Sequence, residues 1–164
     1  MVVEVRAVVA GEWERVRDLR LRALADAPDA FGSTLELERD HDESAWIAWV
    51  QGWEGARNRF LVAETAESWL GMAVGSREAG EVDAHLYGMW VEPAWRRRGV
   101  GRALVDGVVE WARADGVRAL VLGVTEGNDG AADLYSACGF VDTGERHPLR
   151  DGSRLRMRVY RLEL

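Results

Sequence analysis

The spacing of apolar residues changes repeatedly between a period of two and a helical period, which predicts a chain of alternating strands and helices. Apolar residues at every second position predict a short first strand over residues 2–8. A stripe with helical spacing predicts a helix over 12–25. This helix ends at Asp26-Ala27-Pro28-Asp29, because proline and the residue before it leave helical geometry. Residues 31–34 are predicted to form a loop, and 44–53 a second helix.

Three strands follow in the middle of the chain, over residues 59–65, 68–77 and 82–91. In the third strand, regular alternation predicts that His85 and Met89 share one face. Asp83, Tyr87 and Val91 would lie on that face too, with Ala84, Leu86, Gly88 and Trp90 on the other. A glycine inside a strand, here Gly88, often marks a bulge or a close approach of backbone.

The last part of the chain predicts two more helices and three more strands. Residues 99–114 form a helix with an apolar stripe, and 118–124 form a strand that is apolar throughout and therefore buried on both faces. Asn128 is placed to cap a helix over 128–137, which ends at Cys138-Gly139. Strands over 140–145 and 154–162 are predicted to pair as a hairpin around Asp151-Gly152.

The order of these elements is β-α-α-β-β-β-α-β-α-β-β, which predicts an α/β fold with a mixed sheet. Antiparallel strands come first, a β-α-β crossover lies in the middle, and helices cover both faces of the sheet. A length of 164 residues suits one domain over 1–164 with a real hydrophobic core.

Charge and composition narrow the range of partners. A formal net charge of −7 argues against nucleic acid and suits a cationic small molecule or a basic peptide. Cys138 is the only cysteine, so no intrachain disulfide can form. The N-terminus carries an acid where a signal peptide has its basic region, and no apolar run is long enough to span a membrane. We therefore expect a cytoplasmic protein without a membrane partner.

A basic, glycine-containing turn follows the strand over 82–91 and has the features of a phosphate site. Glycine lets backbone approach a ligand, a helix N-terminus offers free N–H groups, and arginine suits phosphate oxygens. The turn consists of Arg96, Arg97, Arg98, Gly99, Val100, Gly101 and Arg102. A P-loop is excluded because the chain contains no lysine. A dinucleotide site is disfavoured because the third small residue is out of register and the next strand carries no acid.

Two motifs together resemble those of the GCN5-related N-acetyltransferase (GNAT) superfamily. Arg96 to Gly101 match the pattern R/Q-x-x-G-x-G/A, and Asn128 to Phe140 resemble N-x-x-A-x-x-L-Y-x-x-x-G-F. The resemblance is close over residues 82–140. It implies the GNAT fold, a mostly antiparallel central sheet with one splayed parallel pair and helices on both faces. It also implies a single N-acetyltransferase domain over the whole chain.

The resemblance implies an acyltransferase that moves an acetyl group from acetyl-CoA to a primary amine of a small molecule, by direct attack in a ternary complex. No metal is implied, and His41, His85 and His147 lack metal-ligand spacing. Two alternatives stay open: acetylation of a protein N-terminus or lysine, and a non-catalytic CoA-binding regulatory domain. Dimers are common in the family, so a homodimer is one expectation.

Catalytic roles are expected of three residues. Tyr135 corresponds to the general acid that protonates the leaving thiolate, and the N–H of Met89 would stabilise the oxyanion. His85 is the preferred general base, because an imidazole titrates near neutral pH. Asp83 and Glu81 are weaker candidates for the base.

Two sets of binding residues complete the expectation. Phe31, Glu36, Asp83 and His85 are assigned to the acceptor. Asn128 could contact the pantetheine arm or serve only as the helix N-cap. The expected acetyl-CoA-binding residues are Met89, Trp90, Val91, Arg96, Arg97, Arg98, Gly99, Val100, Gly101, Arg102, Asn128, Ala131 and Tyr135.

Overall fold

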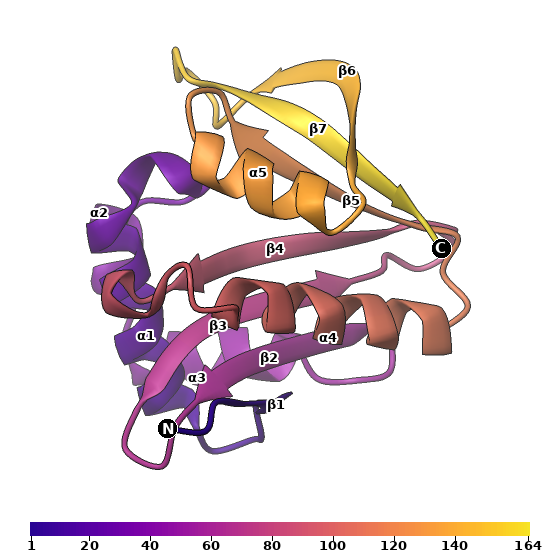
Figure 1. Ribbon diagram of the computed structural model, residues 1–164. Coiled ribbons are helices and arrows are strands. Elements are labelled where there is room, and N and C mark those ends of the chain that lie inside the picture. The colour runs from indigo at the N-terminus through magenta and orange to yellow at the C-terminus, as the bar shows by residue number, and fades with distance from the viewer.

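The protein folds around one seven-stranded mixed sheet, which the computed structural model describes over residues 1–164 (Figure 1). The strand order is β1-β2-β3-β4-β5-β7-β6, and only the central β4–β5 pair is parallel. The strands are β1 (Glu4–Ala7), β2 (Asn58–Glu64), β3 (Trp69–Ser76), β4 (Ala84–Val91), β5 (Ala119–Thr125), β6 (Val141–Pro148) and β7 (Arg156–Glu163). The helices are α1 (Trp13–Asp26), α2 (Leu35–Arg39), α3 (Glu43–Gly52), α4 (Val100–Ala114) and α5 (Asp129–Ala137), with 3₁₀ turns at Pro28–Ala30 and Pro93–Trp95.

Helices cover both faces of the sheet and divide the core into two clusters. The stripe of α4 that contains Leu104 and Val108 is fully buried against β2, β3 and β4, and α5 packs on the same side. On the other face, α1 and α3 bury Val16, Leu19 and Val50 against β2 and β3. The amphipathic pattern of each helix therefore determines which face of the sheet it covers.

The parallel strands β4 and β5 are paired over only a short stretch. Their paired residues are Ala84 with Leu120 and His85 with Val121, after which the strands diverge toward the left of Figure 1. The edge of β5 from Leu122 to Thr125 thus has no β4 partner, although its other edge pairs with β7. This divergence opens the middle of the sheet and confirms the splayed pair implied by the resemblance.

The predicted elements occur within a few residues of their expected positions, with one exception. The sequence pattern predicted two helices before the second strand, whereas the structure has three α-helices there. The additional helix, α2, has only five residues, too few to show a periodic apolar pattern. Thr34 caps it by accepting a hydrogen bond from the Leu37 N–H at 3.4 Å.

The predicted alternation along β4 is wrong beyond Tyr87, because a bulge shifts it by one residue. Tyr87 pairs with Val74 and Trp90 with Met72, so two β4 residues stand opposite one β3 residue. Gly88 has φ +60°, the left-handed conformation that a bulge of this kind uses. As a result, Met89 packs with Leu86 on the α4 side, whereas His85 stacks on Tyr87 on the other side. His85 and Met89 thus do not share a face.

No helix is long and apolar enough to cross a membrane. Nowhere do three or more His, Cys, Asp or Glu side chains come together in a group that could hold a metal ion.

Candidate active site

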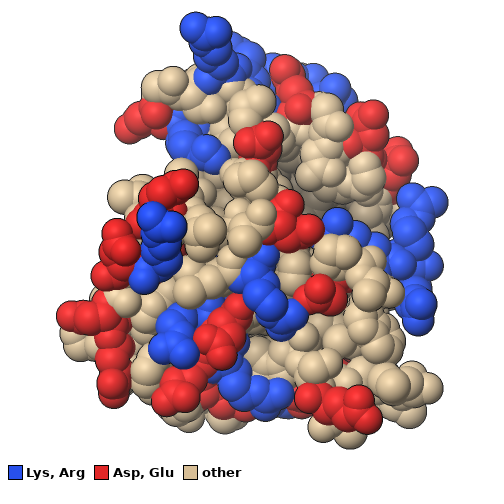
Figure 2. All heavy atoms as spheres, turned by 90° about the vertical axis from the view of Figure 1, so that its left-hand side faces the viewer, with Lys and Arg blue, Asp and Glu red and all other residues tan.

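A cleft of about 1410 Å³ passes through the opening between β4 and β5. Figure 2 shows one face of the molecule, where mainly uncharged atoms surround a hollow between its upper and lower parts. The cleft reaches from α1, α2 and α3 across the sheet to α5 and the β6–β7 hairpin. Six residues that the sequence assigned to the site line it: Phe31, His85, Met89, Asn128, Ala131 and Tyr135.

At Gly88 and Met89 the edge of β4 that faces β5 has no strand partner, because the β5 pairing ends at His85. On the other edge, the bulge takes both residues out of the regular register with β3. The N–H and C=O groups on the β5-facing edge are therefore available to a ligand in the cleft, since a strand leaves unpaired groups wherever its neighbours diverge. Trp90 and Val91, by contrast, pair with Met72 and Gly71.

The arginine–glycine turn forms the N-terminal end of α4. Gly99 has φ +85° and serves as the N-cap, and the first helical hydrogen bond runs from the Ala103 N–H to the Gly99 carbonyl at 3.0 Å. The N–H groups of Val100, Gly101 and Arg102 precede that bond and have no partner within the helix. A Cβ on Gly101 would lie 3.0 Å from Leu134 and 3.2 Å from Met89, so glycine permits this close packing.

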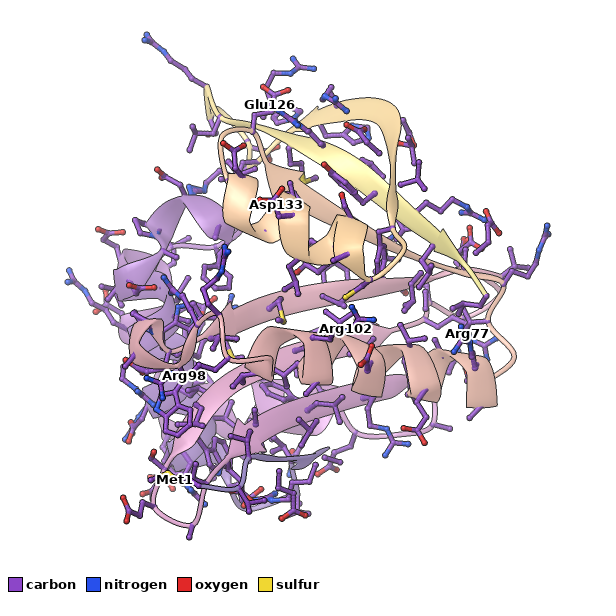
Figure 3. The ribbon with its side chains drawn as sticks, viewed as in Figure 1. Met1, Arg77, Arg98, Arg102, Glu126 and Asp133 are labelled. Carbon is purple, nitrogen blue, oxygen red and sulfur yellow. The ribbon has the colours of Figure 1, made fainter.

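The four arginines of this turn are not equivalent. Arg97 and Arg98 are exposed, and Arg98 lies over the Trp95 ring at 5.4 Å, near the start of α4 (Figure 3). Arg96 pairs with Asp26 and donates to the Val91 carbonyl at 2.9 Å. Arg102 lies between α4 and α5 and donates to the Ala137 carbonyl at 3.2 Å. The guanidinium groups of Arg96 and Arg102 thus stabilise the fold, whereas those of Arg97 and Arg98 remain free to bind an anion.

Tyr135 lies in the cleft on α5 and is almost completely buried. Its ring packs edge-on against Phe140, with 5.7 Å between centroids. Burial, and to a lesser extent the Cys138 thiol, raises the pKa of the Tyr135 phenol above its ordinary value. The side chain therefore enters the cleft as a protonated donor. Asn128 caps α5 by accepting from the Ala131 N–H at 3.2 Å, so its side-chain oxygen is engaged.

Only some of the residues assigned to the acceptor lie in the cleft. Phe31 and His85 line the cleft. Asp83 lies before the splay and pairs with Arg161 at 2.6 Å, and Glu36 is an exposed residue of α2; neither lines the cleft. Glu81, the other candidate base, is also exposed outside it. Of the three candidate bases, His85 is thus the one in the cleft.

A buried ion pair in the cleft was not anticipated. The Arg20 guanidinium donates to both carboxylate oxygens of Glu38, from Nε at 2.9 Å and from Nη2 at 2.8 Å. The residues are only 9% and 7% exposed, respectively. Burial opposes ionisation of Glu38, but the hydrogen bonds and charge of Arg20, together with smaller contributions from Ser33 and His41, outweigh it and hold the pKa of that carboxyl below its ordinary value. The sequence contained one sign of this ion pair, because Arg20 occupies a position on the apolar stripe of α1.

Long-range contacts close one side of the cleft. Arg150, in the turn between β6 and β7, donates to the Pro28 carbonyl at 2.9 Å and the Phe31 carbonyl at 3.2 Å. Thr125, at the end of β5, donates to the Asp29 carbonyl at 2.6 Å. The segment between α1 and α2 is thus tied to the far half of the sheet, across the opening between β4 and β5.

The family model of the acetyltransferase (GNAT) family matches residues 13–140, most of the chain. The chain belongs to the GNAT acetyltransferase family. Among curated GNAT relatives, mycothiol acetyltransferase of Beutenbergia cavernae is 32% identical over 127 residues, covering 75% of this chain and 39% of the relative. The [ribosomal protein bS18]-alanine N-acetyltransferase of Escherichia coli is 34% identical over 73 residues, covering 43% of this chain and 49% of the relative. The chain spans about half or less of the length of the curated relatives it matches.

Solved GNAT structures share the whole fold. The yncA protein of Salmonella typhimurium, solved with its cofactor acetyl-CoA, superposes with a TM-score of 0.82 and 20% identity. The match covers 100% of this chain and 95% of that one. The arrangement of a splayed sheet around a central cleft is therefore that of the GNAT fold.

Proposed function

We propose that the protein is an acetyl-CoA-dependent N-acetyltransferase that acetylates a primary amine of a small molecule by direct attack in a ternary complex. One observation carries the proposal. The unpaired backbone at Gly88 and Met89 lies in the same cleft as the buried, protonated phenol of Tyr135, where β4 and β5 diverge.

The residues present fit acetyl-CoA, which supplies a thioester whose acetyl group passes to the amine. The free N–H groups at the start of α4, with Arg97 and Arg98, would hold the pyrophosphate. The unpaired groups at Gly88 and Met89 would pair with pantetheine amides, as an added strand would. The cleft lining at Ala131 and Tyr135 then borders the thioester end.

The chain also provides groups for the two proton transfers. An alkyl amine has a pKa near 10, so its deprotonation at pH 7 costs about 4 kcal/mol, and His85 would accept that proton, directly or through a water molecule. The Met89 N–H would donate to the oxygen that gains charge as the C–N bond forms. As the C–S bond breaks, Tyr135 would donate its proton to the sulfur. The second proton, which the attacking nitrogen loses as the amide forms, would return to the Tyr135 oxygen through water, and His85 would release its proton to bulk water.

The ties around the cleft favour a small acceptor. Arg150 and Thr125 hold the α1–α2 segment against the opposite half of the sheet, which narrows the path that an extended peptide would need. The similarity to a ribosomal-protein alanine acetyltransferase supports the alternative of a protein N-terminus, and the similarity to mycothiol acetyltransferase supports a small acceptor.

Calorimetry with acetyl-CoA and an amine panel that reads CoA release test the proposal. We expect micromolar acetyl-CoA binding, and the Arg97→Ala/Arg98→Ala variant should weaken it about tenfold or more, because two charge-assisted phosphate contacts are lost. Arg113→Ala, an exposed arginine at the far end of α4, is the control and should bind normally. Absence of any binding heat contradicts the proposal, whereas binding without turnover of any amine or peptide indicates a non-catalytic domain.

Replacing His85 by alanine tests the assignment of the base. We expect a lower rate at pH 7 and a rate that climbs about tenfold per pH unit toward the pKa of the amine, because only the free amine then reacts. His147→Ala is the matched control, since His147 lines the same cleft from β6. A pH–rate profile identical to that of the unmodified enzyme would remove His85 as the base.

A further inference from the structure

The Arg20 guanidinium has one free edge. Glu38 occupies the edge formed by Nε and Nη2, with hydrogen bonds of 2.9 and 2.8 Å. The remaining terminal nitrogen, Nη1, makes no hydrogen bond to the protein. A guanidinium can bind one carboxylate along Nε and Nη2 and a second along Nη1 and Nη2, because its five donors lie in one plane. Arg20 can therefore take a second anion without releasing Glu38.

The free edge of Arg20 lies beside the β4 bulge in the cleft. A Cβ built on Gly88 would lie 3.7 Å from Arg20 Nη1, and both residues line the cleft. The guanidinium is thus beside the β4 bulge, one residue from Met89. Its side chain is only 10% exposed, so water competes weakly for these donors. Nη1 is not among the enclosed side-chain atoms that lack a partner, so this donor can be reached by a ligand in the cleft.

Aromatic side chains surround this donor on the same side of the sheet. The Arg20 guanidinium carbon lies 4.9 Å from the Phe31 ring centre and 5.6 Å from that of Trp49. Trp53 contacts Trp49 and also Tyr87, with ring centres 6.0 and 6.5 Å apart. All of them line the cleft. The space next to the free edge therefore suits an apolar or aromatic group.

We infer that the acceptor is an α-amino acid with an apolar or aromatic side chain, whose carboxylate binds the Nη1 edge of Arg20. The inference rests on the proposed function and adds its substrate class. In an α-amino acid the amine nitrogen is two bonds from the carboxylate carbon, and successive Cα atoms of a strand are 3.8 Å apart. A carboxylate held beside Gly88 thus keeps its amine within reach of Met89, where the acetyl group would be presented.

Matched acceptors test the inference on the unmodified protein. Each of phenylalanine, tryptophan, leucine and methionine is compared with its decarboxylated amine, at equal concentrations of free amine, by CoA release. We expect kcat/KM at least tenfold higher for at least one amino acid than for its amine. The inference is overturned if kcat/KM for every amine equals or exceeds that for its amino acid. It is also overturned if phenylalaninamide or a phenylalanyl peptide is preferred over phenylalanine.

Variants and a binding measurement tie the preference to Arg20. Arg20→Gln, and the double variant Arg20→Met/Glu38→Leu that leaves no charge unpaired, should both lose the preference for the amino acid and keep their acetyl-CoA affinity. Arg57 also lines the cleft, and the control variant Arg57→Gln should retain the preference for the amino acid. Retention of the preference in both Arg20 variants overturns the inference.

Tryptophan fluorescence in the presence of CoA gives a readout that does not need turnover. Phenylalanine and leucine should bind more tightly than phenethylamine and isopentylamine, because only the amino acids carry the carboxylate that Arg20 would bind. Trp49 and Trp53 line the space that we assign to the side chains, so their fluorescence reports binding. If neither amino acid binds better than its amine, the inference fails. A failure of acetyl-CoA itself to bind would instead refute the proposed function, so the two failures are distinguishable.

Discussion

Replacing Tyr135 by phenylalanine is expected to lower kcat by about 10²-fold or more, the usual contribution of a positioned general acid. The ring and its edge-on contact with Phe140 are kept, and only the hydroxyl is removed. Acetyl-CoA affinity should therefore stay unchanged in calorimetry, while the rate of CoA release falls. Because the departing thiolate would lose its proton donor, the loss should be in kcat and not in KM.

The pH dependence and a control variant sharpen this prediction. Burial raises the pKa of the Tyr135 phenol, so in the unmodified enzyme the rate should show no decline from tyrosine ionisation at pH 9–10, the usual range. Tyr160→Phe removes a hydroxyl from another buried tyrosine, one that does not line the cleft, and should leave kcat unchanged. An undiminished kcat in Tyr135→Phe would show that the thiolate leaves without this donor.

Replacing Glu38 by leucine is expected to lower the free energy of unfolding by about 3–5 kcal/mol, because it leaves the buried Arg20 guanidinium without its carboxylate. The double variant Arg20→Met/Glu38→Leu should recover most of that loss, since neither charge then remains in the core. Denaturant unfolding of both single variants and the double variant measures the coupling. Equal destabilisation by the single and double variants would contradict a coupled pair.

The same pair should contribute to acid sensitivity. The folded-state pKa of Glu38 lies below its unfolded value, because the hydrogen bonds and charge of Arg20, with smaller contributions from Ser33 and His41, together outweigh the burial that opposes its ionisation. Its contribution to stability is therefore complete above the unfolded pKa of about 4.3 and is lost as pH falls through the lower folded pKa. The midpoint of urea unfolding should fall less steeply below pH 4 in the double variant than in the unmodified protein.

Most helices and strands, and the candidate residues for the cofactor side of the site, followed from the sequence for local reasons. The buried stripe of α4 is visible as a 3.6-residue period, and the end of α1 is marked by Pro28. The arginine–glycine turn and the segment from Asn128 to Phe140 are each continuous in the chain. Their geometry depends on residues that lie next to one another, which is why the family and the position of Tyr135 were recognisable.

The acceptor side was less predictable, because it is assembled from distant parts of the chain. Asp83 was assigned to it, but Arg161, 78 residues away, pairs with Asp83 outside the cleft. Glu38 reads as a surface charge on its own helix, and the position of Arg20 on the apolar stripe of α1 does not reveal its partner. Their burial depends on how α1 and α2 pack on the sheet, which no local pattern encodes.

The bulge in β4 shows most clearly which features followed from the sequence and which depended on the tertiary structure. The sequence was enough to predict a strand over 82–91 and a disturbance at Gly88, because glycine allows the left-handed backbone that a bulge uses. Whether one residue is inserted depends on the register with β3, and a shift of one residue moves the following side chains to the opposite face. Pairing between strands therefore decided that Met89 faces α4, that His85 faces the aromatic side, and that the backbone between them is free to bind.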